Sequence, residues 1–175
     1  MPALLAILDG AGEWLGTQGT DQWAGSRWRA EELRPDLATG GLRVAEKVIT
    51  RDFPGAEPGP AKADRGRIPR RPVPVATMTL GEAASSRWLP ADDPASALYL
   101  SHFAVDRCHA GLGVGSWLIG EAAGEAARRG KRSLRLDAWT TNRRLHDYYR
   151  RRGFRLVRIA GDRSGALFER AVSPR

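Results

Sequence analysis

Apolar positions recur along the chain with helical spacing in some stretches and with strand spacing in others. Helical spacing predicts helices over residues 2–15, about 27–37, 114–129 and about 142–152. Ser26 is placed to cap the second of these helices. Gly130 and Gly153 follow the third and fourth helices, where glycine commonly ends a helix.

Alternating or continuous apolar runs predict the strands. They cover residues 42–50, 75–80, 98–105, 133–139, 154–159 and 166–172. The strands interleave with the predicted helices, so the chain is expected to form a mixed α/β domain over residues 1–175.

Two stretches lack a regular pattern. Residues 53–74 are rich in proline and glycine, which predicts a loop insertion within the domain because the flanking pieces are too short for separate cores. Residues 81–96 also read as loop, with Trp88 and Leu89 expected to pack against the core.

Composition narrows the class of protein. The 175 residues are 42% hydrophobic, which is enough for one sizeable core. No apolar run approaches the roughly 18 residues of a membrane helix, and the first residues lack the charged leader of a secretion signal. Cys108 is the single cysteine, which fits a reducing compartment. We therefore expect a cytoplasmic protein without a membrane partner.

The chain is basic, with a formal net charge of +8. A basic balance can attract nucleic acid or an anionic ligand. The arginines are spread along the chain without a long basic run, however, and short clusters such as Arg70-Arg71 and Arg150–Arg152 indicate solvated surface. Nucleic acid is therefore not the expected partner. Salt-sensitive binding of RNA or DNA would be the evidence for such a partner.

A glycine-rich segment stands between the strand predicted at 98–105 and the helix predicted at 114–129. It contains Gly111, Gly113 and Gly115 at alternate positions. Glycine permits positive φ and a close approach of the backbone to a ligand. The free amides of a helix start then attract an anion. The segment is expected to bind a phosphate or pyrophosphate group; the simpler alternative is a tight turn.

Two known phosphate loops fit this segment poorly. A nucleotide-triphosphate loop needs a lysine after its last glycine, and Gly115 is followed by Ser116 and Trp117. A dinucleotide fingerprint starting at Gly111 would need a glycine at Ser116, although Asp137 lies near the expected position of a ribose-binding carboxylate. The dinucleotide reading is weak and stays open.

A third loop fits better. Phe103-Ala104-Val105 at the strand end, followed by Gly113-Val114-Gly115, resembles the coenzyme-binding segment of the GNAT superfamily of N-acetyltransferases. Ala110 departs from that segment, because the family has Arg or Gln there. A second block is similar as well. It consists of Asn142, Tyr149, Gly153 and Phe154 at the family's spacing.

The resemblance implies the fold and the reaction. The fold would be a mixed, mostly antiparallel central sheet flanked by helices, with the family's first strand missing before the helix at 2–15. The protein would be an acetyl-CoA-dependent N-acetyltransferase, with acetyl-CoA as acyl donor and a small-molecule or peptide amine as acceptor. The alternative is a non-catalytic acyl-CoA-binding protein with a regulatory or docking role. The oligomeric state stays open, a homodimer included.

The same resemblance implies the site residues. The backbone of Phe103, Ala104 and Val105 would pair with the pantetheine arm, and the Val105 amide would face the thioester carbonyl. The pyrophosphate would be held by the amides of Gly111, Leu112, Gly113, Val114, Gly115 and Ser116. Asn142 would hydrogen-bond the coenzyme arm, or alternatively cap its helix. Tyr149 would protonate the leaving thiolate, or alternatively be a core aromatic.

The general base and the acceptor site are less defined. His102, Asp137 and His146 are candidate bases, and none of them stands out. His102 lies on the strand that would carry the acetyl group, but a strand residue that faces solvent or a hydrogen-bond partner is the simpler reading. The histidines and Cys108 lack metal-ligand spacing, so no metal is expected. The acceptor would lie against the first two helices and the 81–96 loop. Acidic residues there that could suit a cationic amine are Asp21, Asp92 and Asp93.

Overall fold

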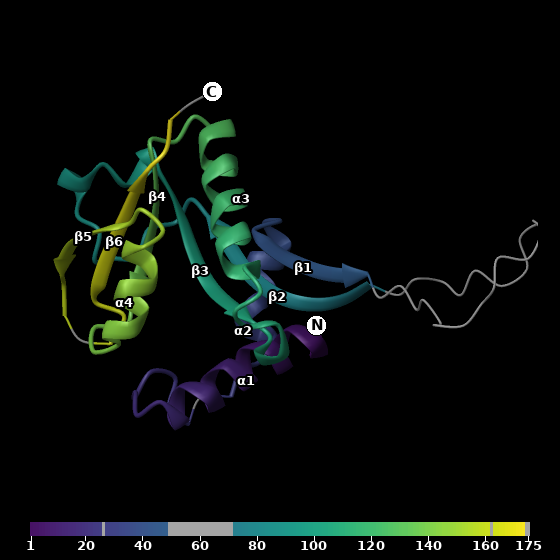
Figure 1. The fold of residues 1–175 in the computed structure, drawn as a ribbon. Helices are drawn as coiled ribbons and strands as arrows, with labels where there is room; N and C mark the ends of the chain where they lie inside the picture. The colour runs from purple at the N-terminus through teal and green to yellow at the C-terminus, as the bar shows by residue number, and fades with distance from the viewer. Residues whose placement is uncertain (26, 49–71, 162, 174–175) are drawn as a thin grey trace, which may run out of the picture.

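A computed structural model shows helices on both faces of one twisted sheet (Figure 1). It describes residues 1–25, 27–48, 72–161 and 163–173. The helices are α1 (Pro2–Thr17), α2 (Ala30–Ala38), α3 (Val114–Arg128) and α4 (Arg143–Arg150). The strands are β1 (Leu42–Val48), β2 (Pro72–Gly81), β3 (Ala97–Val105), β4 (Ser133–Ala138), β5 (Arg155–Ile159) and β6 (Ala166–Ala171). Short 3-10 turns lie at η1 (Pro90–Asp92), η2 (Pro94–Ser96) and η3 (Arg107–His109).

The sheet has the strand order β1-β2-β3-β4-β6-β5. Neighbouring strands are antiparallel except for β3 and β4, which run parallel. The parallel pair is short: Ala97–Tyr99 of β3 pairs with Ser133–Arg135 of β4. Beyond these residues the two strands separate, as Figure 1 shows. The mixed, mostly antiparallel sheet predicted from the family resemblance is confirmed.

Each face of the sheet has its own apolar cluster. On one face, Leu118, Ile119 and Ala122 of α3 and Tyr149 of α4 pack in the main core. On the other face, a second cluster joins α1 and α2 to the sheet through Leu8, Leu33 and Ala104. Neighbouring residues of β3 lie in different clusters. Such alternation is the period-2 pattern of a strand that is buried on both faces.

The observed boundaries correct several predictions. Helix α2 begins at Ala30 rather than near residue 27, and its start is closed by the Glu32 carboxylate, which accepts from Arg29 N at 2.7 Å. Ser26, predicted as the cap, lies outside the described residues, as do residues 49–71 of the predicted strand end and loop insertion. Residues 72–74, predicted as loop, belong to β2.

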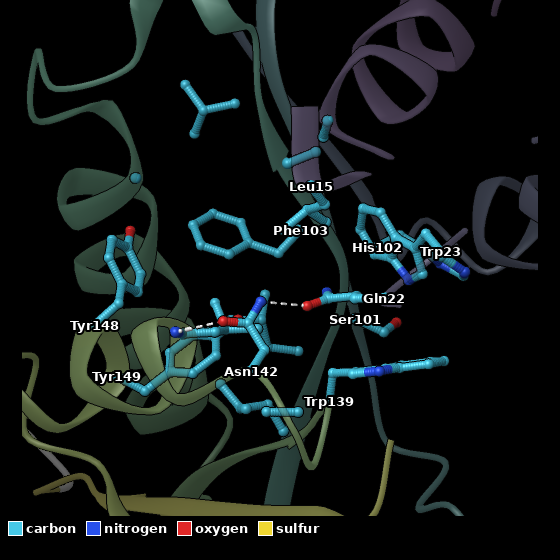
Figure 2. A pocket seen from close by; sticks show the side chains of 18 of the residues that line it. Leu15, Gln22, Trp23, Ser101, His102, Phe103, Trp139, Asn142, Tyr148 and Tyr149 are labelled. Carbon is cyan, nitrogen blue, oxygen red and sulfur yellow. Dashed lines mark hydrogen bonds between the residues drawn. The ribbon is translucent and has the colours of Figure 1, made fainter. Parts of the chain in front are cut away.

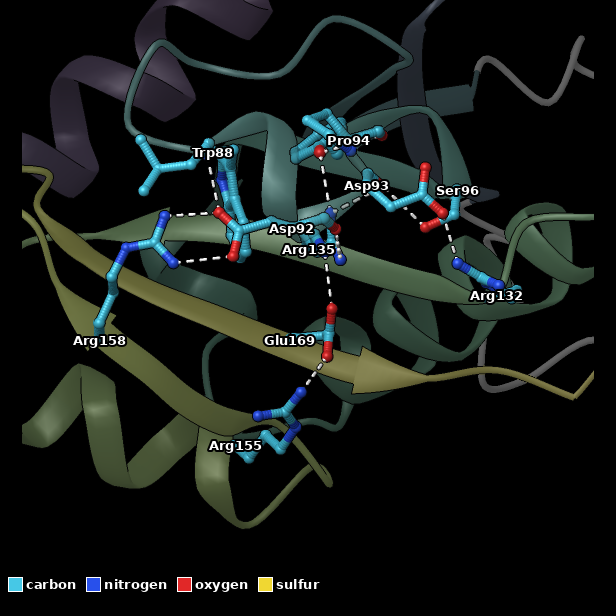
Figure 3. A network of polar contacts seen from close by, with 12 residues as sticks. Trp88, Asp92, Asp93, Pro94, Ser96, Arg132, Arg135, Arg155, Arg158 and Glu169 are labelled. Atoms are coloured by element: carbon cyan, nitrogen blue, oxygen red, sulfur yellow. Dashed lines mark hydrogen bonds and ion pairs between the residues drawn. The ribbon is translucent and has the colours of Figure 1, made fainter.

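The loop after β2 is fastened to the sheet by an arginine–carboxylate network (Figure 3). Arg135, only 6% exposed, donates to Glu169 and to the Asp92 carbonyl, each at 2.7 Å. Arg158 binds both carboxylate oxygens of Asp92, and these hydrogen bonds lower the pKa of Asp92 to about 2. Trp88 is buried here as predicted, whereas Leu89 is 52% exposed, contrary to the prediction.

Gly41, just before β1, lies close to the backbone of β2. A Cβ at this position would lie 2.7 Å from the carbonyl oxygen of Leu80, whose amide donates to Gly41 O at 2.9 Å. Because a backbone atom cannot swing aside as a side chain does, Gly41→Ala should lower the free energy of unfolding by about 1–3 kcal/mol. Urea denaturation measures this change.

The matched control is Gly10→Ala in α1, where nothing lies within 4 Å of the added Cβ. That variant should gain about 0.5–1 kcal/mol, because alanine is the better helix residue. Equal stability of Gly41→Ala and the unaltered protein would contradict the close approach of β1 and β2.

Candidate active site

A large open cavity lies where β3 and β4 separate. Its walls come from α1 and the segment that follows it, from β3, from the glycine segment, and from the ends of β4 and α4. Figure 2 shows side chains from these distant parts of the sequence converging on it. The parting of a parallel strand pair leaves one edge of β3 without a neighbour, which a ligand can occupy.

The glycine segment presents a continuous row of backbone N–H groups. Gly111 and Gly113 have φ of +81° and +83°, a conformation that favours glycine, and Gly113 immediately precedes α3. Within the described part of the chain, no amide from Gly111 to Ser116 donates a hydrogen bond. These N–H groups are therefore available to an anion at the positive end of the α3 dipole.

The third glycine of the segment has a packing role. A Cβ on Gly115 would collide with the hydroxyl of Tyr148 and would lie 3.4 Å from the Phe103 ring. The absence of a side chain at Gly115 therefore lets α4 and β3 approach the start of α3.

A guanidinium lies beside this row of amides. Arg152 stacks 3.4 Å from the centre of the Tyr148 ring, and its Nη2 donates to Ser116 Oγ at 2.7 Å. The prediction that residues 150–152 are merely solvated surface is therefore wrong for Arg152, which lines the cavity. Its charge adds to the attraction for an anion at the start of α3, a region where Ala110 supplies none.

The exposed edge of β3 is shaped by an irregularity in its pairing with β2. His102 has φ of +46°, and the register shifts between Thr77 and Thr79 on the partner strand. Past this bulge, Asp106 N donates to Val75 O at 2.8 Å. Since N–H groups alternate sides along a strand, the Val105 N–H points away from β2, toward the cavity. The hydrogen bond predicted between the Val105 N–H and a thioester carbonyl stays a prediction.

Tyr149 is held firmly at the α4 side of the cavity. It is 6% exposed, and its ring packs edge-on against Phe154 and Tyr148, with centroids 5.6 Å and 5.5 Å apart. Both tyrosines line the cavity (Figure 2). Burial raises the pKa of Tyr149 well above its ordinary value near 10, so the phenol is protonated at neutral pH. A protonated phenol is a donor, as the predicted acid role requires.

Asn142 makes two hydrogen bonds within the protein. Its Oδ1 accepts from Leu145 N at 3.0 Å, which makes it the cap of α4. Its Nδ2 donates to Gln22 Oε1 at 2.7 Å, so the residue also ties α4 to the segment after α1 (Figure 2). A bond from Asn142 to a coenzyme arm would have to use the second hydrogen of the amide nitrogen, and it stays a prediction.

The far end of the cavity is aromatic and acidic. Asp21 accepts from Trp139 Nε1 at 2.7 Å and from Thr141 Oγ1 at 2.9 Å. Asp137 accepts from Trp88 Nε1 at 2.7 Å, so its carboxylate is already engaged. Among the predicted acidic residues, Asp21 lines the cavity. Asp92 and Asp93 instead bind arginines in the network of Figure 3, so their predicted acceptor role is wrong.

The candidate bases separate in the structure. His146 is 7% exposed, its Nε2 is 2.9 Å from Trp139 O, and its ring packs on Phe168. It does not line the cavity. His102 lines the cavity and pairs through Nδ1 with Asp36 Oδ2 at 3.0 Å. No pattern in the sequence indicated Asp36, which lies on α2, whereas His102 lies on β3.

No helix in the described part of the chain is long and apolar enough to span a membrane. Within the same residues, no three His, Cys, Asp or Glu side chains gather as metal ligands.

Comparison with known proteins identifies a matching family and solved structures with a similar fold. Residues 73–154 match the model of the acetyltransferase (GNAT) family. A search of curated proteins found no significant match. Among solved structures, the fold is similar to a GNAT-family acetyltransferase from Listeria monocytogenes, with a TM-score of 0.64, 20% identity, and coverage of 95% of this chain and 85% of that one.

Two further structures share the fold. A ribosomal-protein-alanine N-acetyltransferase from Brucella melitensis has a TM-score of 0.60 at 19% identity, covering 98% of this chain and 93% of that one. An N-acetyltransferase from Staphylococcus aureus has a TM-score of 0.57 at 17% identity, covering 96% and 87%. The match to the GNAT family model, from β2 to Phe154, includes the glycine segment and α4, so residues 73–154 are a GNAT-family acetyltransferase segment within a chain that shares the fold of these structures.

Proposed function

We propose that the protein transfers the acetyl group of acetyl-CoA directly to a primary amine of a small molecule or peptide. The observation that carries this proposal is the row of free amides from Gly111 to Ser116, a segment that, apart from Leu112, lines the cavity between β3 and β4. A diphosphate seated there would direct the rest of a long coenzyme along the unpaired edge of β3.

We assign coenzyme binding, polarisation of the thioester carbonyl and protonation of the thiolate to particular groups of the chain. The backbone of Phe103 to Val105 would bind the pantetheine arm as an added strand, and the Val105 N–H would polarise the thioester carbonyl. The amine nitrogen would attack the carbonyl carbon, a C–N bond would form and the C–S bond would break. Tyr149 would give its proton to the departing thiolate and recover one from solvent.

Ligand-induced stabilisation tests the coenzyme assignment. Acetyl-CoA and CoA at about 100 times their Kd should each stabilise the protein by about 2.7 kcal/mol, a rise in Tm of roughly 5–10 °C for a chain of this size. NAD and NADP, which share the adenosine diphosphate, serve as controls and should shift Tm much less. A shift with the dinucleotides alone would overturn the proposal.

Turnover distinguishes an enzyme from a binding protein. Release of the CoA thiol, followed with a panel of small amines and N-terminal peptides, should depend on both acetyl-CoA and amine. Mass spectrometry of the product should show one acetyl group on nitrogen. Stabilisation by acetyl-CoA without thiol release from any member of the panel would favour the non-catalytic alternative.

A further inference from the structure

Three residues from separate elements form a hydrogen-bonded chain at the acceptor end of the cavity. Asp36 of α2 accepts at its Oδ2 from the hydroxyl of Thr79 on β2, at 3.0 Å. The same Oδ2 lies 3.0 Å from Nδ1 of His102 on β3. All three side chains line the cavity. The chain therefore ends on an imidazole ring whose position is fixed by a carboxylate.

The backbone at His102 is held in an uncommon conformation. Its φ of +46° lies in the left-handed region, which costs a residue other than glycine about 1–2 kcal/mol. The ring is further positioned by Trp28, whose indole meets it edge-on with centroids 5.2 Å apart. A strained residue in a cavity, held by contacts with Asp36, Thr79 and Trp28, is typical of a site where orientation matters.

The hydrogen bonds determine which ring nitrogen is free. An ionised carboxylate only accepts, so Nδ1 of His102 carries the proton in the pair with Asp36. Nε2 makes no hydrogen bond within the described part of the chain, and the side chain is 25% exposed. The Nε2 lone pair is therefore open to a molecule in the cavity. Asp36 is the charged group in contact with the ring, and its other neighbours, Thr79 and Trp28, are neutral.

We propose that His102, oriented by Asp36, is the base that deprotonates the acceptor amine, an inference that rests on the proposed acetyl transfer. An alkylammonium ion gives one proton to Nε2 and becomes a neutral amine. The amine nitrogen then forms the C–N bond as the C–S bond breaks, and its second proton leaves to solvent. The thiolate takes a proton from Tyr149, which recovers one from solvent, and the imidazolium returns its proton to solvent, so the turnover releases one proton overall.

The pH dependence of turnover tests this role. In the unaltered protein, kcat/KM should rise with pH on the acid side, because a protonated imidazole cannot accept a proton from the amine. His102→Gln should lower kcat/KM about 100-fold or more at pH 7 and abolish that rise, leaving a rate that climbs with hydroxide concentration. The Kd for acetyl-CoA should stay within about threefold, since the glycine segment is untouched. An unchanged rate and profile would overturn the proposal.

Asp36→Asn provides a second variant that keeps the size of the side chain. Its amide can donate to Nδ1, which would place the proton on Nε2 and block the base. We expect a loss of about 10- to 100-fold in kcat with little change in Tm. A full rate in this variant would contradict the orienting role of Asp36.

A spectroscopic measurement separates this proposal from the proposed function. The ¹⁵N shifts of the His102 ring in the resting protein, measured above pH 8 without coenzyme, should show the proton on Nδ1, and Asp36→Asn should move it to Nε2. A proton on Nε2 in the unaltered protein would overturn the proposal even if acetyl transfer is observed. Failure of the unaltered protein to bind acetyl-CoA would instead overturn the proposed function, and the catalytic role of His102 with it.

Discussion

Replacing Tyr149 by phenylalanine should lower kcat by about 100- to 10,000-fold while leaving the Kd for acetyl-CoA within about threefold. The substitution removes only the hydroxyl, so the packing of the ring against Phe154 and Phe168 is retained. The free energy of unfolding should therefore change little. Steady-state kinetics with a turnover substrate and isothermal titration with acetyl-CoA separate the two effects.

Tyr148→Phe is the matched control on the same helix. The hydroxyl of Tyr148 lies against Gly115 at the start of α3, and its ring stacks under Arg152. We expect this variant to keep kcat within severalfold. The reverse result, a large loss for Tyr148→Phe and none for Tyr149→Phe, would transfer the acid role to Tyr148 and contradict our assignment.

The environment of Tyr149 adds a prediction about the pH profile. Burial raises the pKa of its hydroxyl, so the phenol stays protonated beyond the pH at which an exposed tyrosine ionises, about 10. A loss of activity between neutral pH and about pH 10 would therefore not be caused by ionisation of Tyr149. This distinguishes the buried acid from the proposed base, the imidazole of His102, which would act only in its unprotonated form.

The parts of the fold that the sequence predicted are those governed by local pattern. The strand, glycine segment and helix from β3 to α3 were predicted within a residue or two of their observed ends, because apolar spacing and glycine placement are local signals. Helix α4 was also predicted, with Asn142 as one option for its cap. The start of α2 was misplaced, since its closing contact is a Glu32 carboxylate rather than a conventional capping residue.

The side of the cavity that contains His102 and Gln22 could not be predicted, because its contacts join residues far apart in the chain. Asp36 and His102 are separated by 66 positions, and Gln22 and Asn142 by 120. Neither pair has a spacing that local periodicity can reveal. Likewise, Arg152 belongs to an arginine run that resembles solvated surface, and only the packing of α4 against α3 brings it beside Ser116. Tertiary folding, rather than sequence motif, assembles this half of the cavity.

Gly113→Val should raise the Kd for acetyl-CoA by about 10- to 100-fold. Gly113 has φ of +83°, which a β-branched residue adopts only under strain of about 1–3 kcal/mol. The segment lies at the surface, with Leu112 69% exposed, so it can relax to a negative φ in the free protein. Binding a diphosphate would then require the strained conformation to be restored, and the strain appears as lost affinity.

The matched control is Gly120→Val, within the regular part of α3, where nothing lies within 4 Å of an added Cβ. It should bind acetyl-CoA with unchanged Kd, because valine is no worse than glycine in a helix interior. Tm without ligand should be measured for both variants, so that a loss of folding is not mistaken for a loss of binding. Unchanged affinity in a folded Gly113→Val variant would mean that the amides of this segment do not hold the diphosphate, and the coenzyme would have to be bound elsewhere in the cavity.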